Sequence, residues 1–314
     1  MSPQEKEIDG QDLKEALEAA QVCLKKHIEE VNTLNVFPVP DGDTGINMFL
    51  TMKAAVEATK KSEAADVSSV STSAARGALL GARGNSGVIL SQILRGIARG
   101  IGEKKRFSAI DFANALHIAS EQAYKVVANP VEGTMLTVIR EAAEVASRTA
   151  QKGADFKRTI SSVVSQAKKT VKKTPDMLPV LKEAGVVDAG AKGLYYVFQG
   201  MERAIHKKST KAETVEENPK TSSPRQKERV YGFDVQFIIQ GENLPFEEIR
   251  NRVNASGECP LVIGDESLIR VHVHTQNPDD ILNYARSKGT LQDILIEDMD
   301  QQVQEKMEKE SKRK

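Results

Sequence analysis

The chain of 314 residues contains no tryptophan, only 4% aromatic residues and only two cysteines. Cys23 and Cys259 lie far apart in the sequence, which excludes a disulfide framework and predicts a reduced, cytoplasmic protein. No apolar run reaches the roughly 18 residues that a transmembrane helix needs, and the charged N-terminus is unlike a signal peptide. Because 44 basic residues balance 44 acidic ones, the basic charge typical of a nucleic-acid-binding protein is also absent.

Helical periodicity dominates the first two thirds of the chain. After Asp9, a candidate helix cap, apolar residues from Leu13 to Val31 recur in steps of three and four and line one helix face. The same spacing predicts seven further helices, over residues 45–60, 69–82, 87–102, 108–127, 134–151, 155–172 and 190–207. Loops rich in Gly, Pro, Asp and Asn lie between them, at 35–45, 81–87, 129–134 and 185–190. We therefore predict an all-α antiparallel bundle over residues 1–206, with its functional site on loops at one end.

The pattern changes after this domain. Residues 207–228 contain no Leu, Ile, Phe or Met and predict a flexible linker. In residues 229–298 the apolar spacing shortens to two, and the segments predict the order β-α-β-β-α-β of a ferredoxin-like sheet. The chain is thus expected to be multi-domain, with a small α+β domain after the helical one. The polar tail, 299–314, is expected to be a frayed helix or a disordered end.

The segment NVFPVPDGDTGINM, residues 35–48, concentrates groups that bind hard cations. Gly42 allows the backbone to turn so that the carboxylates of Asp41 and Asp43 can converge. Paired carboxylates beside an amide oxygen are ligands that Mg²⁺ takes when it also holds nucleotide phosphates. Free amides at the following helix start, Thr44-Gly45, would suit an anion. The alternative is a turn that caps a helix, because Asp-Gly-Asp is common in turns.

A second segment, GARGNSG over residues 81–87, packs three glycines, an asparagine and a serine in front of a predicted helix. Glycine lets a backbone approach a phosphate closely, and a helix N-terminus supplies oriented N–H groups. The segment is neither a Walker loop nor a dinucleotide fingerprint. The alternative is a tight helix–helix crossing that needs small residues. Together, the two segments favour nucleotide binding.

Two histidines indicate a second metal site. His272 and His274 are two residues apart on a predicted strand, so both imidazoles project from one face. If a two-residue turn forms at 265–266, Cys259 lies opposite His272, and the first strand brings Asp234 to the other side. These four side chains are an acceptable tetrahedral set for zinc, in a site expected to be structural. The alternative is a pair of half-exposed histidines in an ordinary sheet.

Four motifs carry a family resemblance: NVFPVPDGDTGINM, GARGNSGVILSQ, NPVEGTMLTV and VVDAGAKGL. In this order they resemble the ATP-binding subunit of bacterial fatty acid kinase and, more broadly, the nucleotide-binding L-subunit of dihydroxyacetone kinases. The resemblance implies a barrel of about eight antiparallel helices. The strand-rich segment resembles the middle domain of the same kinase subunit. The usual subunit continues into a further C-terminal domain, so this chain is expected to be either a fragment of such a subunit or a short natural form.

The resemblance also implies roles for individual residues. Asn35, Asp41 and Asp43 would hold two Mg²⁺ ions that bridge the phosphates of ATP, and Asp41 and Asp43 would be the catalytic pair. At Asn35 the sequence departs from the dihydroxyacetone kinase branch, which has an Asp there at a spacing one residue shorter. The residues expected to contact the nucleotide are Thr44, Gly45, Asn47, Asn85, Ser86, Gly87, Thr134, Met135, Asp188 and Gly190.

The family's middle domain binds zinc through two such histidines and a cysteine on the first strand. This chain has Asp234 at that position, so its zinc set departs from the family pattern.

The resemblance implies a fatty acid carboxylate as phosphate acceptor, presented by a separate DegV-like fatty-acid-binding subunit. A carboxylate is already ionised at neutral pH, so the transfer requires no general base. Two alternatives remain open: a kinase for dihydroxyacetone or another polyol, which would also need a partner, and a non-catalytic nucleotide-binding scaffold. A homodimer is an open alternative for the assembly.

Overall fold

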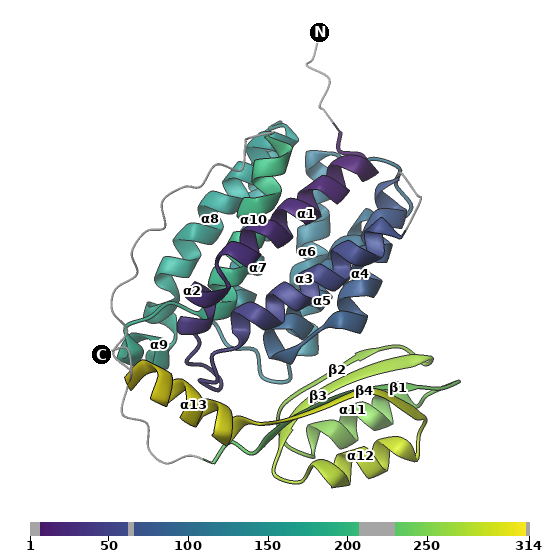
Figure 1. Cartoon of the computed structure of the whole chain (residues 1–314). Helices are drawn as coiled ribbons and strands as arrows, with labels where there is room; N and C mark the ends of the chain where they lie inside the picture. The colour runs from purple at the N-terminus through teal and green to yellow at the C-terminus, as the bar shows by residue number, and fades with distance from the viewer. Residues whose placement is uncertain (1–6, 62–65, 207–229, 312–314) are drawn as a thin grey trace.

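The computed structural model describes residues 7–61, 66–206 and 230–311. Figure 1 shows a helical domain with a smaller sheet domain below it. The linker predicted over 207–228 lies outside the described residues. Among the helices within the described ranges, none is long and apolar enough to cross a membrane.

Eight helices of 15 or more residues form the described helical domain, as the periodicity predicted. Each packs against the next along the chain, and the last returns against the first. They enclose one apolar core that includes Leu24, Met52 and Phe112. The long helices and two short ones, α2 and α9, are α1 (Gly10–Lys26), α2 (Ile28–Thr33), α3 (Thr44–Lys60), α4 (Val67–Gly81), α5 (Gly84–Ile101), α6 (Ala109–Val126), α7 (Met135–Gln151), α8 (Phe156–Met177), α9 (Pro179–Ala184) and α10 (Ala189–Ile205).

The apolar stripe that predicted one helix up to Val31 belongs to two helices. The break lies at His27, whose amide bonds the carbonyl of Leu24 at 3.0 Å. The carbonyl of Cys23, which that amide would otherwise take, is bonded by Nδ1 of the same histidine at 2.8 Å. The imidazole also stacks on Tyr196, with 3.7 Å between the ring centroids. A side chain therefore replaces one backbone bond, and α2 begins in a new direction.

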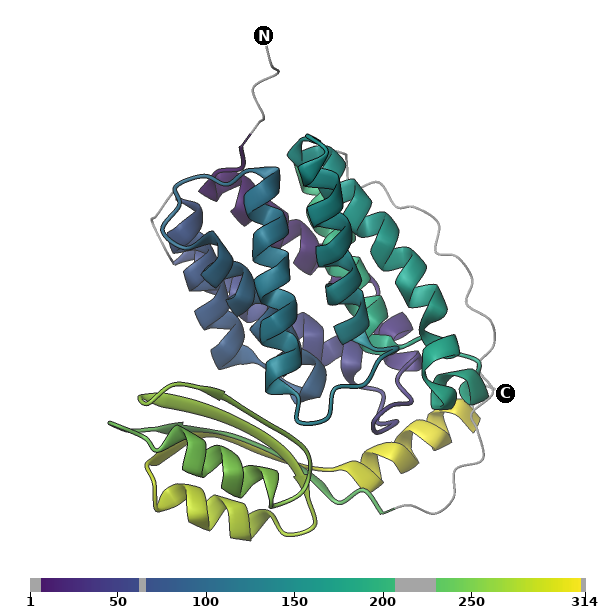
Figure 2. The ribbon, with the colours of Figure 1, turned by 180° about the vertical axis from the view of Figure 1, so that it is seen from behind.

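Alternate connections of an up-and-down bundle fall at the same end. The connections 34–43, 82–83, 127–134 and 178–188 lie at the end that faces the sheet domain (Figures 1 and 2). These are the connections in which the sequence motifs occur. The prediction that the motif-bearing loops gather at one end is confirmed.

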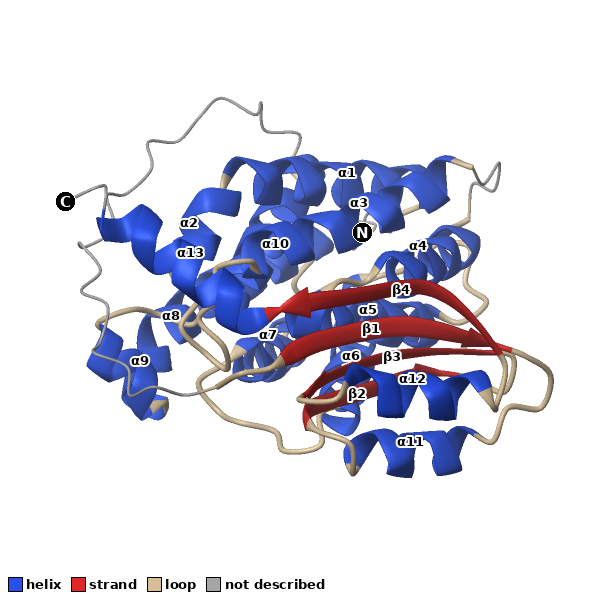
Figure 3. Cartoon of the chain, turned by 60° about the horizontal axis from the view of Figure 1, so that its bottom comes forward, coloured by secondary structure: helices blue, strands red, loops and turns tan. Residues whose placement is uncertain are grey.

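The second domain is an antiparallel sheet with strand order β2-β3-β1-β4. Two helices cover one face of this sheet (Figure 3), which confirms the predicted ferredoxin-like order of elements. Its core contains Val235, Phe237 and Ile239 of the first strand, packed beneath the helices. The elements are β1 (Phe233–Gln240), α11 (Phe246–Asn254), β2 (Glu258–Gly264), β3 (Leu268–Thr275), α12 (Pro278–Arg286) and β4 (Thr290–Asp298).

The opposite face of the sheet is polar and yet buried. Because side chains alternate along a strand, Asp234 and Gln236 point away from α11 and α12, as do Arg270 and His272 of β3. All four are 6% exposed or less. This face lies against the loop end of the helical domain (Figures 1 and 3). The two domains therefore meet through side chains of the kind that usually face water.

The tail expected to be frayed or disordered forms the helix α13 (Met299–Ser311) where it is described. Its Met299 and Val303 pack with Val39 of the helical domain, in a small apolar cluster. These contacts direct the helix along the loop that carries Asp41 (Figure 1). The first turns of the tail are thus part of the domain contact.

Candidate functional site

A small polar cavity of about 30 Å³ lies between the two domains. It joins the acidic segment, the glycine-rich segment and the histidine strand, which the sequence suggested as two separate sites. The lining residues are Asn35, Pro38, Val39, Asp41, Asp43, Thr44, Asn47, Gly84, Asn85, Ser86, Asp234, His272 and His274.

Asp41 and Asp43 converge at this cavity. Nδ2 of Asn35 donates to Oδ1 of Asp41, and Nδ2 of Asn47 donates to Oδ2 of Asp43 at 2.6 Å. Burial raises the pKa of Asp41 well above its usual range, and the charge of Asp43 raises it further. Burial also raises the pKa of Asp43. Two half-buried carboxyl groups in contact favour either a shared proton or a cation between them.

The side chain of Asn32, instead of that of Asp43, caps the start of α3. Asp43 is the N-cap residue of α3, but its side chain accepts no hydrogen bond from a backbone amide of the helix. Instead, Oδ1 of Asn32 accepts from the amides of Gly45 at 2.7 Å and Ile46 at 3.2 Å. The expectation of a free Gly45 amide was therefore wrong. Sequence reasoning missed Asn32, since it stands 12 residues before Thr44, the first residue of α3, and gives no local signal.

Glycines of the second segment serve two purposes. A Cβ at Gly87 would lie 2.4 Å from Oγ1 of Thr51, and one at Gly81 would lie 2.2 Å from Cβ of Ala54, so both allow close packing on α3. Gly84, at the start of α5, has a φ of +55°, which favours glycine. The helix-crossing alternative thus accounts for Gly81 and Gly87, while Gly84 forms the turn into the cavity.

The residues after Gly84 face the cavity. Nδ2 of Asn85 lies 3.5 Å from Nε2 of His274, and Oγ of Ser86 lies 3.5 Å from the carbonyl oxygen of Thr44. Within the described part of the chain, the backbone amides of Asn85 and Ser86 have no hydrogen-bond acceptor. Unpaired amides at a helix N-terminus are a common binding site for phosphate.

Four other expected nucleotide contacts form a separate group. Asp188 caps α10 and accepts from the amide of Ala191 at 2.7 Å, while Thr134 caps α7. An added Cβ at Gly190 would lie 3.4 Å from Oδ1 of Asp188 and 3.5 Å from Cβ of Met135, so these residues are neighbours. Burial raises the pKa of Asp188 to about 7, against hydrogen bonds from backbone amides that lower it. The group lies at the same end of the helices but does not line the cavity.

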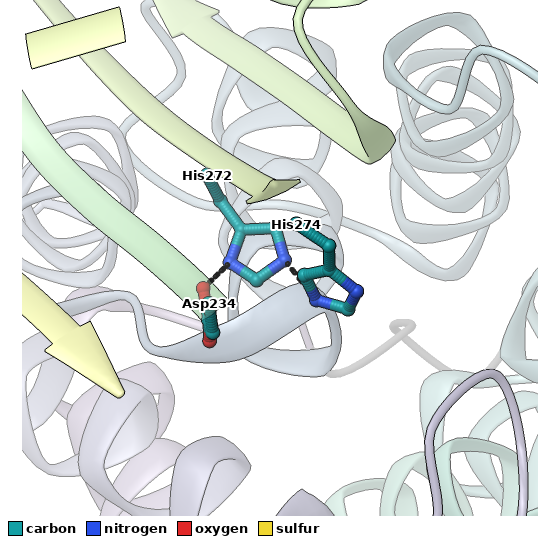
Figure 4. Close-up of side chains that lie close together, drawn as sticks. All are labelled: Asp234, His272 and His274. Atoms are coloured by element: carbon teal, nitrogen blue, oxygen red, sulfur yellow. Dashed lines mark hydrogen bonds and ion pairs between the residues drawn. The ribbon is translucent and has the colours of Figure 1, made fainter. Parts of the chain in front are cut away.

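Asp234, His272 and His274 form a compact buried cluster (Figure 4). Oδ1 of Asp234 lies 3.0 Å from Nδ1 of His272, and Nε2 of His272 lies 3.1 Å from Nε2 of His274. The first pair is not aligned as a hydrogen bond, so neither atom has a hydrogen-bond partner in the described structure. Burial raises the pKa of Asp234, but the neighbouring His272 outweighs burial and the net pKa is below its usual value.

Cys259 does not belong to this cluster, so the predicted four-residue set was wrong. The connection after β2 is longer than two residues, because Oδ1 of Asp265 accepts from Ser267 and Leu268 and holds a wider turn. Leu261 therefore pairs with His272. The ladder is also irregular between Glu258 and Leu261, where Cys259 has a φ of +50°. The histidines and Asp234 are placed as expected.

Both acidic groups fit a cation. In the cluster of Asp234, His272 and His274, one ligand atom from each residue lies within 4.8 Å of the others, a span that a single ion can bridge. Carboxylate and imidazole are ligands of zinc. The half-buried pair of Asp41 and Asp43 offers the hard oxygen ligands of Mg²⁺. In the cluster of Asp234, His272 and His274, a positive ion would relieve the cost of burying the unpaired Oδ1 of Asp234 and Nδ1 of His272.

Sequence reasoning missed two further charged residues beside the cavity. Nζ of Lys306 on α13 donates to the carbonyl of Asn35 at 2.6 Å, and its charge lowers the pKa of Asp41. Glu297 pairs with Asp234 across β1 and β4. Burial raises the pKa of Glu297, and the charges of Asp234 and Asp43 raise it further. Both lie in segments without a motif, so only the fold reveals them.

Comparison with known proteins gives a match to two family models. One, described as the DAK2 domain, matches residues 38–203. The other, described as the FakA-like middle domain of fatty acid kinase, matches residues 230–306. The first match covers the helical domain from the loop before α3 onward, and the second covers the sheet domain and the first part of α13.

Similar proteins occur in bacteria. Protein YloV of Bacillus subtilis is 38% identical over 320 residues, which cover 97% of this chain and 58% of that protein. An uncharacterized protein of Staphylococcus saprophyticus is 36% identical over 316 residues, which cover 96% of this chain and 57% of that protein. This chain thus spans somewhat more than half the length of these relatives. The dihydroxyacetone kinase of C. freundii aligns with a TM-score of 0.44 at 15% identity, covering 65% of this chain and 37% of that one.

Proposed function

The chain belongs to the DAK2 domain family, and from this premise we propose that it is the ATP-dependent phosphotransferase subunit of a fatty acid kinase. It would transfer the γ-phosphate of Mg-ATP to a fatty acid carboxylate. The match of the second domain to the FakA-like middle domain of fatty acid kinase supports this choice of acceptor.

One observation carries the proposal: two half-buried carboxylates and a helix N-terminus with unpaired amides line the same cavity. Asp41 and Asp43, with Asn35, would hold Mg²⁺, which supplies charge neutralisation for the phosphates. The amides of Asn85 and Ser86 would bind phosphate oxygens. Phosphoryl transfer requires mainly alignment and charge compensation, and these groups can provide both.

The remaining nucleotide contacts extend from this centre. Thr44 and Asn47 line the cavity, and Asn47 orients Asp43 through its hydrogen bond. The group of Thr134, Met135, Asp188 and Gly190 would contact the nucleoside part. Its buried position at the same end of the domain supports this assignment.

The second metal group would hold zinc through Asp234, His272 and His274. Its ligand atoms line the same cavity as Asp43. A cation there would therefore stabilise the sheet and also add positive charge beside the phosphates.

The acceptor would arrive on a DegV-like fatty-acid-binding protein, in the cytoplasm. The cavity between the domains is lined mostly by polar side chains, so it offers no apolar wall for an acyl chain. A carboxylate needs no general base, and the acceptor must only be brought into line with the γ-phosphate.

The test is phosphoryl transfer by the whole chain, with hydroxylamine added to trap an acyl phosphate as a hydroxamate. We expect hydroxamate to form with a fatty-acid-loaded DegV-like protein and to be scarce with free fatty acid. Transfer to dihydroxyacetone instead would favour a polyol kinase. Binding of Mg-ATP without transfer to either acceptor would favour a nucleotide-binding scaffold.

A further inference from the structure

The turn between α4 and α5 is held by side chains of the other domain. The guanidinium of Arg270 donates to the carbonyl of Leu80 at 2.8 Å and also to the carbonyl of Ala82. Two residues later, the amide of Gly84 donates to Oε1 of Gln236 at 3.2 Å. One strand pair thus holds the last carbonyls of α4 and the first amide of α5.

These contacts satisfy backbone groups that their own helices cannot. The last carbonyls and first amides of a helix have no partner within it, and burying them unpaired is costly. Ala82 and Gly84 are buried beneath the sheet, where Ala82 packs with Leu261. The N-cap residue of α5, Arg83, makes no side-chain bond to the helix. Gln236 therefore serves as its N-cap from the other domain.

Arg270 is suited to the end of α4. Its side chain is 2% exposed, and burial lowers its pKa to about 10, so it stays charged at neutral pH. A positive charge at a helix C-terminus interacts favourably with the helix dipole. A planar guanidinium can bond two carbonyls at once, which lysine cannot do in the same way.

Gln236 also connects this turn to the metal cluster. Its Nε2 donates to Oδ2 of Asp234 at 2.8 Å, while Oδ1 of Asp234 lies beside His272. A continuous path of contacts therefore runs from His272 through Asp234 and Gln236 to the first amide of α5. A shift at either end would move the other.

We propose that Gln236 and Arg270 are positioning residues, which fix the start of α5 so that the amides of Asn85 and Ser86 face the phosphates. The inference rests on the proposed function for its catalytic consequence, whereas the clamp itself is a property of the fold. The sheet domain then helps to set the geometry of the nucleotide site, although neither residue touches the nucleotide.

Hydrogen exchange of the whole wild-type chain, resolved to single amides by NMR, tests the clamp. The first amides of a helix normally exchange freely, so Gly84 should exchange at least about tenfold more slowly than Asn85 and Ser86. Equal rates at the three amides would overturn the proposal. This measurement needs no variant and no activity.

Variants test whether Oε1 of Gln236, the acceptor atom, causes the slow exchange of the Gly84 amide. Gln236→Leu keeps the size but removes the acceptor, so Gly84 should exchange about tenfold faster than in the wild type. Gln292→Leu, an exposed position of β4, is the matched control and should change nothing. Unchanged exchange of the Gly84 amide in Gln236→Leu, or equally faster exchange in Gln292→Leu, would contradict the clamp.

The catalytic consequence is measured separately. Measured well below the melting temperature of each variant, kcat/KM for Mg-ATP should fall about tenfold in Gln236→Leu and in Arg270→Lys, and should not fall in Arg286→Lys, on the outer helix. Unchanged kcat/KM in both variants would show that the clamp is only structural and overturn the positioning role. If the wild type transfers no phosphate, the proposed function fails, while the exchange result still decides the clamp.

Discussion

Helices α6 and α3 begin in different ways. Ser108 caps α6 and accepts from the amide of Asp111, whose carboxylate accepts from the amide of Ser108 in return. Asp43 stands at the same position of α3, but Asn32 caps that helix instead, and the carboxylate of Asp43 faces the cavity. A remote cap thus leaves a residue of capping type available for chemistry.

The contrast extends across the helical domain. The other long helices α1, α4, α7, α8 and α10 also begin with a side-chain cap of their own. Only α3 and α5, among the long helices described, lack one, and these two line the cavity. Helix starts at functional sites are expected to depart from the usual local capping, because the residues there also serve binding or catalysis.

The largest expected effect follows from removing the freed carboxylate. Asp43→Ala should lower phosphoryl transfer at least a hundredfold, a loss of about 3 kcal/mol or more, because a buried Mg²⁺ ligand is lost. The melting temperature should not fall, since burial of this carboxyl group is itself unfavourable. The assay is hydroxamate formation with a loaded partner.

Asp176→Ala, at an exposed position of the same domain, is the control and should keep full activity. Transfer by Asp43→Ala within tenfold of the wild type would remove Asp43 from the site.

The zinc content of two variants compares His272, a residue of the metal cluster, with Cys259, which lies outside it. Protein purified without added metal should contain about one zinc ion per chain by elemental analysis. His272→Ala should lose it, and Cys259→Ser should retain it, because Cys259 is absent from the cluster. Equal zinc loss in the two variants would mean that the sulfur is a ligand after all.

Asp188 caps its own helix, α10, and is buried at the end of the helical domain that carries the site. Its pKa of about 7 in the folded state exceeds the value of about 4 expected when unfolded, so the folded chain binds the extra proton between these pH values. Its contribution to stability is full below pH 4 and is lost as pH rises through 7, a change on the order of 4 kcal/mol.

Urea unfolding at pH 5 and pH 8 measures this change. The free energy of unfolding of Asp188→Asn should fall less between the two pH values than that of the wild type, because asparagine does not titrate. Parallel values for the two proteins would show that Asp188 is ionised in the fold.

The smallest effect compares the two kinds of cap directly. Asn32→Ala and Ser108→Ala should each lower the free energy of unfolding by about 1 kcal/mol. Only Asn32→Ala should also weaken Mg-ATP binding, about tenfold, because Asp43 would turn to cap α3. Calorimetric titration with Mg-ATP distinguishes them. A matching loss of affinity in both variants would mean that stability alone controls binding.

Local signals made much of the fold predictable. Apolar spacing located the eight long helices and the β-α-β-β-α-β order, and it placed the start of α6 at 108, within a residue of the observed Ala109. The remote contacts were not predictable in this way. Asn32, Gln236 and Lys306 act on segments far from them in the sequence, and no local rule relates such positions.

The candidate site was likewise predictable from local patterns within a segment, but not where it depends on contacts between distant segments. Asp41 and Asp43 were found from their own segment, and His272 and His274 from strand alternation. Cys259 was misplaced because the turn at Asp265 is held by its side chain and lengthens the connection. That both groups share one cavity depends on how the domains pack, which spacing within either domain does not encode.

The most direct test of the account is calorimetric titration of the whole chain with ATP, in the presence and absence of Mg²⁺. We predict that ATP binds in the presence of Mg²⁺, that removal of Mg²⁺ weakens binding at least about tenfold, and that Asp43→Ala removes the difference. Binding that is equally strong with and without Mg²⁺, or unchanged in Asp43→Ala, would contradict a Mg-ATP site at these carboxylates.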